Sequence, residues 1–162
     1  MASQPMPTAN TDIATVWAFL EEGIDHIMTK RDTDLPYERF WALYTVQYNY
    51  CTSSSPSTSA NLRGYDLYHG LVCYFEQYLQ HLRDVRRFFM TIDHHEYLLQ
   101  YSDSLQNELL LSYYSAEWDV YTTGANYVNS LFAYLNRHWI KRERDEGRRD
   151  VYPIYTVRTS SE

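Results

Sequence analysis

The 162-residue chain has little of several features that particular classes of protein require. It contains only two cysteines and five glycines, and its formal net charge is −7. Cys51 and Cys73 belong to apolar stretches, which favours buried free thiols over a disulfide framework. So few glycines make a phosphate-cradling loop hard to build. A negative net charge is the opposite of the electrostatic footprint that nucleic acids and anionic membrane surfaces select.

Long apolar runs and targeting signals are missing as well. No run approaches the roughly 20 apolar residues that span a bilayer. Residues 1–10 lack the basic and apolar regions of a signal peptide. We therefore expect the protein in the cytoplasm and the nucleus, with neither a membrane nor a nucleic acid as its partner.

The motifs of common active sites are also absent from the sequence. There is no HExxH, CxxC, GxGxxG, P-loop or GxSxG pattern. His94, His95 and Glu96 lie together, but adjacent residues of a helix point to different faces, so a chance cluster is the simpler interpretation. Glu22 and His26 lack the Glu-x-x-His spacing of a carboxylate-bridged metal bundle. We expect no enzyme activity, no metal and no cofactor.

Aromatic residues, by contrast, are abundant. They make up 17% of the chain and include 17 tyrosines and four tryptophans. Tyr and Trp combine a large apolar face with a polar group, which suits half-buried positions and protein interfaces. A tyrosine-rich core is the alternative interpretation.

Hydrophobic periodicity predicts an all-α bundle of five helices. The first runs from about Asp12 to Lys30 with Thr11 as its N-cap, and the second from about Pro36 to Cys51. A Ser/Thr-rich loop at residues 52–63 precedes the third. Apolar residues nearly encircle the second helix, whereas a surface helix needs only one apolar stripe to face its own core. This excess is the strongest physical indication of a binding partner.

The fourth and fifth helices are predicted at residues 107–121 and 125–144, separated by a break at residues 122–124. The charged segment 141–146 is interpreted as a solvated face with compensating ion pairs. Gly147 is expected to end the fifth helix. The predicted inward face of the fifth helix consists of Val128, Leu131, Phe132, Leu135 and Trp139.

Three stretches of the chain have a recognisable pattern. They are WAFLEEGIDHIMTK at residues 17–30, LYTVQYNYCTS at residues 43–53, and the region from Tyr114 to Tyr155, which contains AEWDVYTTGANYVNSLFAYLNRHWIKRERDEGRRDVYPIY. All three resemble the cullin family, nearest the class that scaffolds Skp/cullin/F-box ubiquitin ligases and its fungal members. The resemblance implies a five-helix cullin repeat over residues 12–156, after a disordered tail at residues 1–11.

What the resemblance implies about function is specific. The first cullin repeat of this class docks a Skp-type adaptor with a BTB/POZ-like fold, which carries F-box substrate receptors in ubiquitin-dependent protein catabolism. The second and fifth helices make these contacts. Matched position by position, the adaptor-binding candidates are Phe40, Trp41, Tyr44, Thr45 and Val46 on the second helix and Asn126, Tyr127, Ser130 and Tyr134 on the fifth.

The chain also departs from the family pattern. Family members are several times longer, so we expect a truncated module that lacks the region recruiting the RING-box protein. Residues 85–101 form an atypical insertion and residues 157–162 an atypical tail. Both segments begin with Val-Arg, whose codons are compatible with a splice donor, and our hypothesis is that both are translated introns. The alternative is genuine sequence, namely a real loop insertion and a natural short isoform. The expected function is adaptor binding without a complete ligase scaffold. The alternative is a generic helical interaction or structural protein, or a truncated gene product without function.

Overall fold

The computed structural model describes residues 6–8, 11–29, 35–53, 60–92, 103–148 and 150–154. Its helices are α1 (Ile13–Thr29), α2 (Tyr37–Thr52), α3 (Ala60–Ile92), α4 (Asp103–Leu131), α5 (Ala133–Leu135), η2 (Asn136–Ile140) and α6 (Lys141–Asp145). The described residues contain no strand. The predicted all-α bundle is confirmed, with α5, the π-helix η2 and α6 together forming a bent fifth helix.

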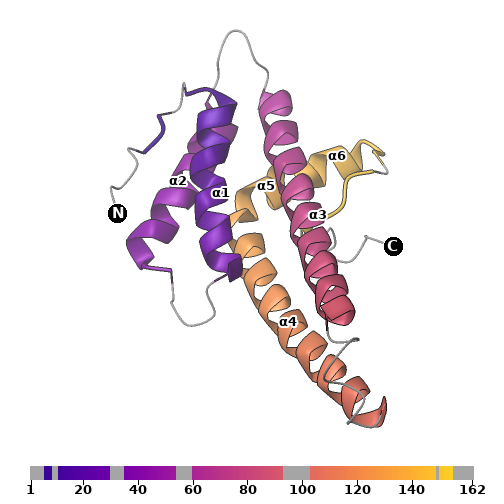
Figure 1. Ribbon diagram of the computed structural model, residues 1–162. Coiled ribbons are helices and arrows are strands. Elements are labelled where there is room, and N and C mark those ends of the chain that lie inside the picture. The colour runs from indigo at the N-terminus through magenta and orange to yellow at the C-terminus, as the bar shows by residue number, and fades with distance from the viewer. Residues whose placement is uncertain are drawn as a thin grey trace.

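The arrangement of the helices places α1 between α2 and α4. α1 packs on both of these helices, and α2 also contacts α3, α4 and α5. The long helices α3 and α4 extend beyond this contact region, whereas α5, η2 and α6 turn away from the end of α4 and pass beside α3 (Figure 1). α2 therefore reaches the junction at which α4 ends and α5 begins.

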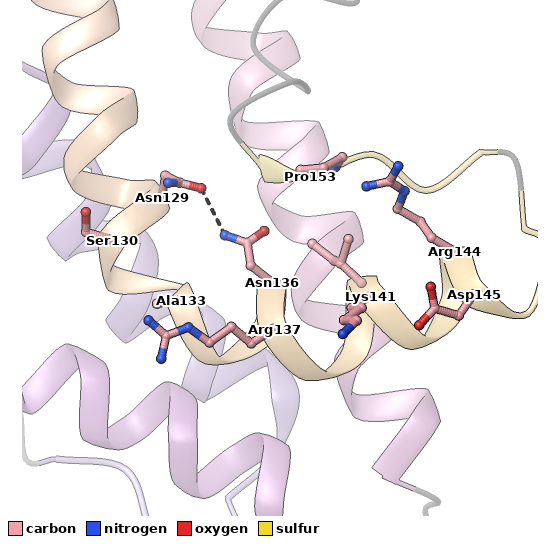
Figure 2. Close-up of a pocket in the computed structure, with 10 residues that line it drawn as sticks. Asn129, Ser130, Ala133, Asn136, Arg137, Lys141, Arg144, Asp145 and Pro153 are labelled. Atoms are coloured by element: carbon pink, nitrogen blue, oxygen red, sulfur yellow. Dashed lines mark hydrogen bonds between the residues drawn. The ribbon is translucent and has the colours of Figure 1, made fainter.

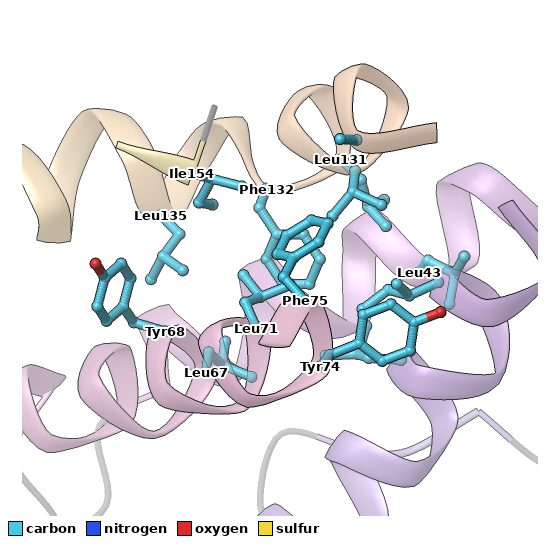
Figure 3. Close-up of a cluster of buried hydrophobic side chains, with 14 of the residues drawn as sticks. Leu43, Leu67, Tyr68, Leu71, Tyr74, Phe75, Leu131, Phe132, Leu135 and Ile154 are labelled. Carbon is cyan, nitrogen blue, oxygen red and sulfur yellow. The ribbon is translucent and has the colours of Figure 1, made fainter. Parts of the chain in front are cut away.

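The core forms where these helices meet. Leu43 of α2, Leu71 and Phe75 of α3, and Phe132 and Leu135 near the end of α4 are all fully buried or nearly so (Figure 3). The inward face predicted for the fifth helix is confirmed, because each of its five residues is buried. Helical spacing located these positions correctly, since burying an apolar side chain contributes about 1.5–3 kcal/mol and so determines which face turns inward.

The first helix begins with a different cap from the one expected. Asp12 supplies it, because its Oδ2 accepts a hydrogen bond from the Ala14 N–H at 3.2 Å and its carbonyl accepts one from Val16. Thr11 instead accepts a hydrogen bond from the Thr8 N–H at 2.9 Å. The prediction of Thr11 as N-cap is thus wrong by one residue, and both side-chain types are good caps.

The loop between α2 and α3 is shorter than the predicted residues 52–63, since α2 ends at Thr52 and α3 already begins at Ala60. Arg63 explains part of this difference. Its buried guanidinium donates hydrogen bonds to the carbonyls of Ser53 at 2.8 Å and Tyr50 at 3.4 Å, and it also contacts the Ser53 hydroxyl. A cation at the carbonyl end of a helix is favourable, so α3 holds the end of α2.

The predicted break at residues 122–124 is wrong. α4 continues through these residues to Leu131, and the chain turns at Phe132 instead. Gly124 allows two helices to approach closely: a Cβ there would lie 2.7 Å from Met28 Sδ and 3.3 Å from Met28 Cα. The glycine therefore serves packing against α1 and does not end the helix.

We expect Gly124→Ala to lower the free energy of unfolding by about 1–3 kcal/mol, because the Met28 thioether would have to move out of the core and the tightly packed α1 backbone beside it would have to shift slightly. Helix propensity alone would predict the opposite, a gain of about 1 kcal/mol. Urea denaturation distinguishes the two signs. Thr123→Ala is the matched control, since Thr123 is an exposed neighbour whose replacement should change stability by only a few tenths of a kcal/mol. A more stable Gly124→Ala protein would contradict the packing role.

The end of the helical region is the predicted solvated face except at one position, since five of the six residues at 141–146 are exposed. Glu143 is fully buried and forms an ion pair with Arg148, whose Nε lies 2.7 Å from Glu143 Oε2. The Arg148 N–H also donates to the Glu143 carbonyl at 3.0 Å. Gly147 ends the helix as predicted, with a φ of +87° that an L-residue rarely adopts. The negative charge of the buried Glu143 carboxylate is thus balanced by Arg148, which the turn at the helix end places beside it.

Several predicted segments lie wholly or partly outside the described residues. For the tail at residues 1–11, the described part includes a Thr11-to-Thr8 backbone hydrogen bond of 3.0 Å. For the insertion at residues 85–101, residues 85–92 continue α3 and the remainder lies outside the described residues. The tail at residues 157–162 lies outside them entirely. The intron hypothesis therefore stays a prediction.

Candidate functional site

A continuous row of aromatic rings runs along α2 and crosses to α5 and η2. We call it the aromatic strip, and it consists of Tyr37, Trp41, Tyr44, Tyr48, Tyr134 and His138. Successive ring centroids lie 5.8, 5.6, 6.4, 4.8 and 4.4 Å apart along this order. These separations are typical of interacting aromatic pairs. Two helices distant in sequence thus share one aromatic surface.

The α2 part of the strip lies mainly on the outer face of the helix, although Tyr44 also packs against the edge of the core. Leu43, Val46, Gln47 and Tyr50 are buried on the opposite face. The strip side includes Trp41, which is 44% exposed even though tryptophan is among the most apolar side chains. The prediction that α2 has apolar material for two faces is confirmed. Exposed aromatic rings grouped in this way are typical of protein interaction surfaces.

The structure brings together only part of the predicted adaptor-binding set. Trp41, Tyr44 and Tyr134 lie within the strip, and Phe40 packs edge-on against Trp41 with ring centroids 6.4 Å apart. Thr45 is half-buried on the same helix. Because the chain turns at Phe132, the fifth-helix candidates are divided between two elements, with Asn126, Tyr127 and Ser130 on α4 and Tyr134 on α5.

Val46 lies apart from the other candidates. Its side chain is 2% exposed and belongs to the core, so it cannot present a surface to a partner in this conformation. Tyr127 is exposed, and the Ser130 hydroxyl donates to the Asn126 carbonyl of its own helix at 3.0 Å. Among the α4 candidates, the exposed phenol ring of Tyr127 offers the largest apolar area.

Three members of the strip were missed by sequence reasoning: Tyr37, Tyr48 and His138. Tyr37, Trp41, Tyr44 and Tyr48 are spaced by four, three and four residues, which places them along one side of a helix. That spacing was available in the sequence as a signal for the two tyrosines. His138 had no such signal, because its contact with Tyr134 depends on the path of η2.

Burial raises the pKa values of two groups at the strip, the Tyr134 phenol and the Cys51 thiol. It raises the pKa of Tyr134, and nearby Cys51, Tyr48 and Tyr44 raise it further, so this phenol stays neutral. Burial also raises the pKa of the Cys51 thiol to about 12, a shift that the Gln47 amide 3.8 Å from Sγ opposes in part. The Tyr134 phenol and the Cys51 thiol are therefore both held in their neutral forms at neutral pH.

The raised pKa of Cys51 has a chemical consequence that can be measured. At pH 8 its thiolate fraction should be about three orders of magnitude below that of an ordinary thiol, and the thiolate is the reactive form. We expect Cys51 in the Cys73→Ser variant to react with a thiol-specific disulfide reagent at least about 100-fold more slowly than Cys73 in the Cys51→Ser variant. Comparable rates in the folded proteins would contradict the shielding of Cys51.

Two observations bear on other kinds of function. No three His, Cys, Asp or Glu side chains in the described part of the chain gather closely enough to hold a metal ion. None of its helices has both the length and the apolar character that crossing a membrane requires.

Comparison with known proteins places this architecture in a family. Residues 17–160 match the family described as Cullin alpha solenoid domain. The chain belongs to the cullin family. It is 36% identical over 88% of its length to Cullin-1 of Dictyostelium discoideum and 32% identical over 87% to Cullin-1 of Schizosaccharomyces pombe. It is also 25% identical over 96% of its length to cell division control protein 53 of Saccharomyces cerevisiae.

These matches cover most of this chain but only 18%, 18% and 19% of the three relatives. The chain thus spans about a fifth of their length and corresponds to the N-terminal cullin-repeat region. Cullins are scaffold proteins. The family membership inferred from the three sequence stretches is confirmed.

Proposed function

We propose that the chain is the adaptor-binding module of a cullin ubiquitin-ligase scaffold and that the aromatic strip is its docking surface. The occupant is a Skp-type adaptor with a BTB/POZ-like fold, which carries F-box substrate receptors. The observation that carries this proposal is the continuity of the strip from α2 to α5, since the family resemblance assigns docking to the second and fifth helices.

The composition of the strip supports the proposal. Most of the binding energy of a protein interface comes from a few side chains, often aromatic or arginine. These side chains are exposed in the free protein and become buried in the complex. Trp41 has this character, because it contacts Tyr37, Phe40 and Tyr44 at its edges while 44% of its surface remains exposed. Partial packing fixes the ring in place, so less rotational freedom is lost when a partner covers it.

The anchoring of α2 supports the proposal as well. Arg39 lies 3.3 Å from Glu22 of α1 and stacks over the Phe19 ring with 4.7 Å between its Cζ and the ring centroid. Arg63 holds the opposite end of the helix. α2 is thus attached at both ends to the rest of the bundle, and a docking surface on a rigid element needs little rearrangement on binding.

Isothermal titration of the full chain with a purified Skp-type adaptor tests the proposal. We expect a one-to-one complex whose formation has a negative heat-capacity change, because apolar rings leave water. A well-folded chain that gives no heat and does not co-elute with the adaptor would refute adaptor binding. The alternatives would then be a generic helical interaction or structural protein, or a truncated gene product without function.

A further inference from the structure

A second surface feature lies beside the aromatic strip and has a different chemical character. It is an open pocket of about 880 Å³ formed by the end of α4, the α5–η2–α6 stretch and Pro153 (Figure 2). Three cations line it, namely Arg137, Lys141 and Arg144, against the single carboxylate of Asp145. A local excess of positive charge is notable in a chain whose net charge is −7.

Within the described part of the chain, the cations of this basic pocket are exposed and not paired with a carboxylate. Arg137, Lys141 and Arg144 are exposed, and no ion pair between them and another described residue is present. The polar amide in the pocket is already engaged, since Asn136 donates to Asn129 Oδ1 at 2.9 Å (Figure 2). Its Oδ1 also accepts from the Ile154 N–H at 3.2 Å. The amides therefore shape the wall, and the cations are the groups left to bind.

The spacing of the cations indicates the kind of ligand. Arg137 and Arg144 are seven residues apart, which corresponds to about 10 Å along a helix. A single small anion cannot span that distance, whereas an extended peptide with several carboxylates can. A polyanionic nucleic acid is disfavoured by the negative charge of the whole chain. An acidic protein segment is the ligand that fits both the open shape and the charge.

The location of the pocket indicates which protein supplies that segment. Arg137 directly precedes His138, and Tyr134 lies three residues earlier, so the pocket and the strip share the α5–η2 stretch. A standard protein–protein interface covers about 800 Å² on each partner. We propose that the basic pocket binds a carboxylate-rich segment of the same partner that docks on the aromatic strip. This inference rests on the proposed function for the identity of that partner.

A fluorescein-labelled octaglutamate peptide and the full-length chain test the charge recognition directly. We expect fluorescence anisotropy to show binding at about 50 mM salt that weakens strongly at about 300 mM, because exposed ion pairs are screened. Arg137→Gln and Lys141→Gln together should weaken binding about fivefold or more. The matched control is Arg83→Gln, which removes an exposed cation from α3 and should leave binding unchanged. Equal binding by the pocket variant and the wild type would overturn the proposal, as would tighter binding of a single-stranded DNA oligonucleotide to the same residues.

A second measurement tests whether one partner occupies both surfaces. A saturating Skp-type adaptor should displace the peptide, and the pocket variant should bind the adaptor more weakly and with less salt dependence. If the adaptor binds the strip but leaves the peptide in place, the assignment to the same partner is overturned. If the adaptor does not bind at all, the proposed function fails together with that assignment. The peptide titration still decides separately whether the pocket recognises carboxylates.

Discussion

Trp41→Ala should raise the dissociation constant for the Skp-type adaptor about 30-fold, which corresponds to roughly 2 kcal/mol. The expected cause is the loss of a large, 44% exposed ring of the strip together with its contacts to Tyr37 and Tyr44. The free energy of unfolding should fall by less than about 1 kcal/mol, because nearly half of the side chain is already in water. Titration calorimetry and urea denaturation of the same preparation measure the two quantities.

The control for this variant is Tyr114→Ala, which removes a ring of similar exposure on the far part of α4, outside the strip. Adaptor affinity should not change in that protein. Tyr44→Ala is a less clean test, since Tyr44 also packs against the core and its loss should weaken binding and stability together. Unaltered adaptor binding by Trp41→Ala would remove the strip from the docking surface.

Phe132→Ala should have the largest effect on stability, about 3–5 kcal/mol. Phe132 is fully buried at the turn between α4 and α5, and its ring lies among Leu71, Phe75 and Leu135 (Figure 3). Natural domains are stable by only about 5–15 kcal/mol, so a large fraction of the protein should be unfolded or readily unfolded. Thermal denaturation followed by circular dichroism at 222 nm is the measurement.

The matched control for Phe132→Ala is a substitution five residues earlier in the sequence, on the exposed face of α4. Tyr127→Ala removes an exposed ring from α4 and should change stability by no more than about 0.5 kcal/mol. Phe132→Leu, which retains most of the apolar volume, should lie between the two. A Phe132→Ala protein as stable as Tyr127→Ala would mean that the turn is not held by this side chain.

Local sequence patterns were sufficient for much of the fold and for half of the site. Periodicity correctly predicted the helical class, the five buried residues of the last helix and the two apolar faces of α2. Both properties depend on spacing along one helix, which the sequence contains completely. The same logic, applied to Tyr37 and Tyr48, would have located the whole α2 part of the strip.

The remaining errors involve competition between local preference and packing. Weak helix formers at residues 122–124 oppose the helix by no more than about 1 kcal/mol each. Burial of Tyr121 and Val128 on either side favours a continuous α4 by more than that. Burial outweighs the unfavourable helix propensity only if α1 lies close enough to cover those side chains. The position of α1 cannot be read from the sequence of α4.

The sequence by itself determined the helical class, the family and the aromatic face of α2, because each is encoded in residues near one another in the chain. Only the tertiary structure decided where α4 ends, that Val46 faces the core, and that Tyr48 meets Tyr134 to join two helices into one surface. It also decided that Glu143 is buried against Arg148 and that the basic pocket adjoins the strip. These features depend on how close segments far apart in the sequence lie, or on the direction of the chain after a turn. The spacing of residues along one helix specifies neither of these two properties.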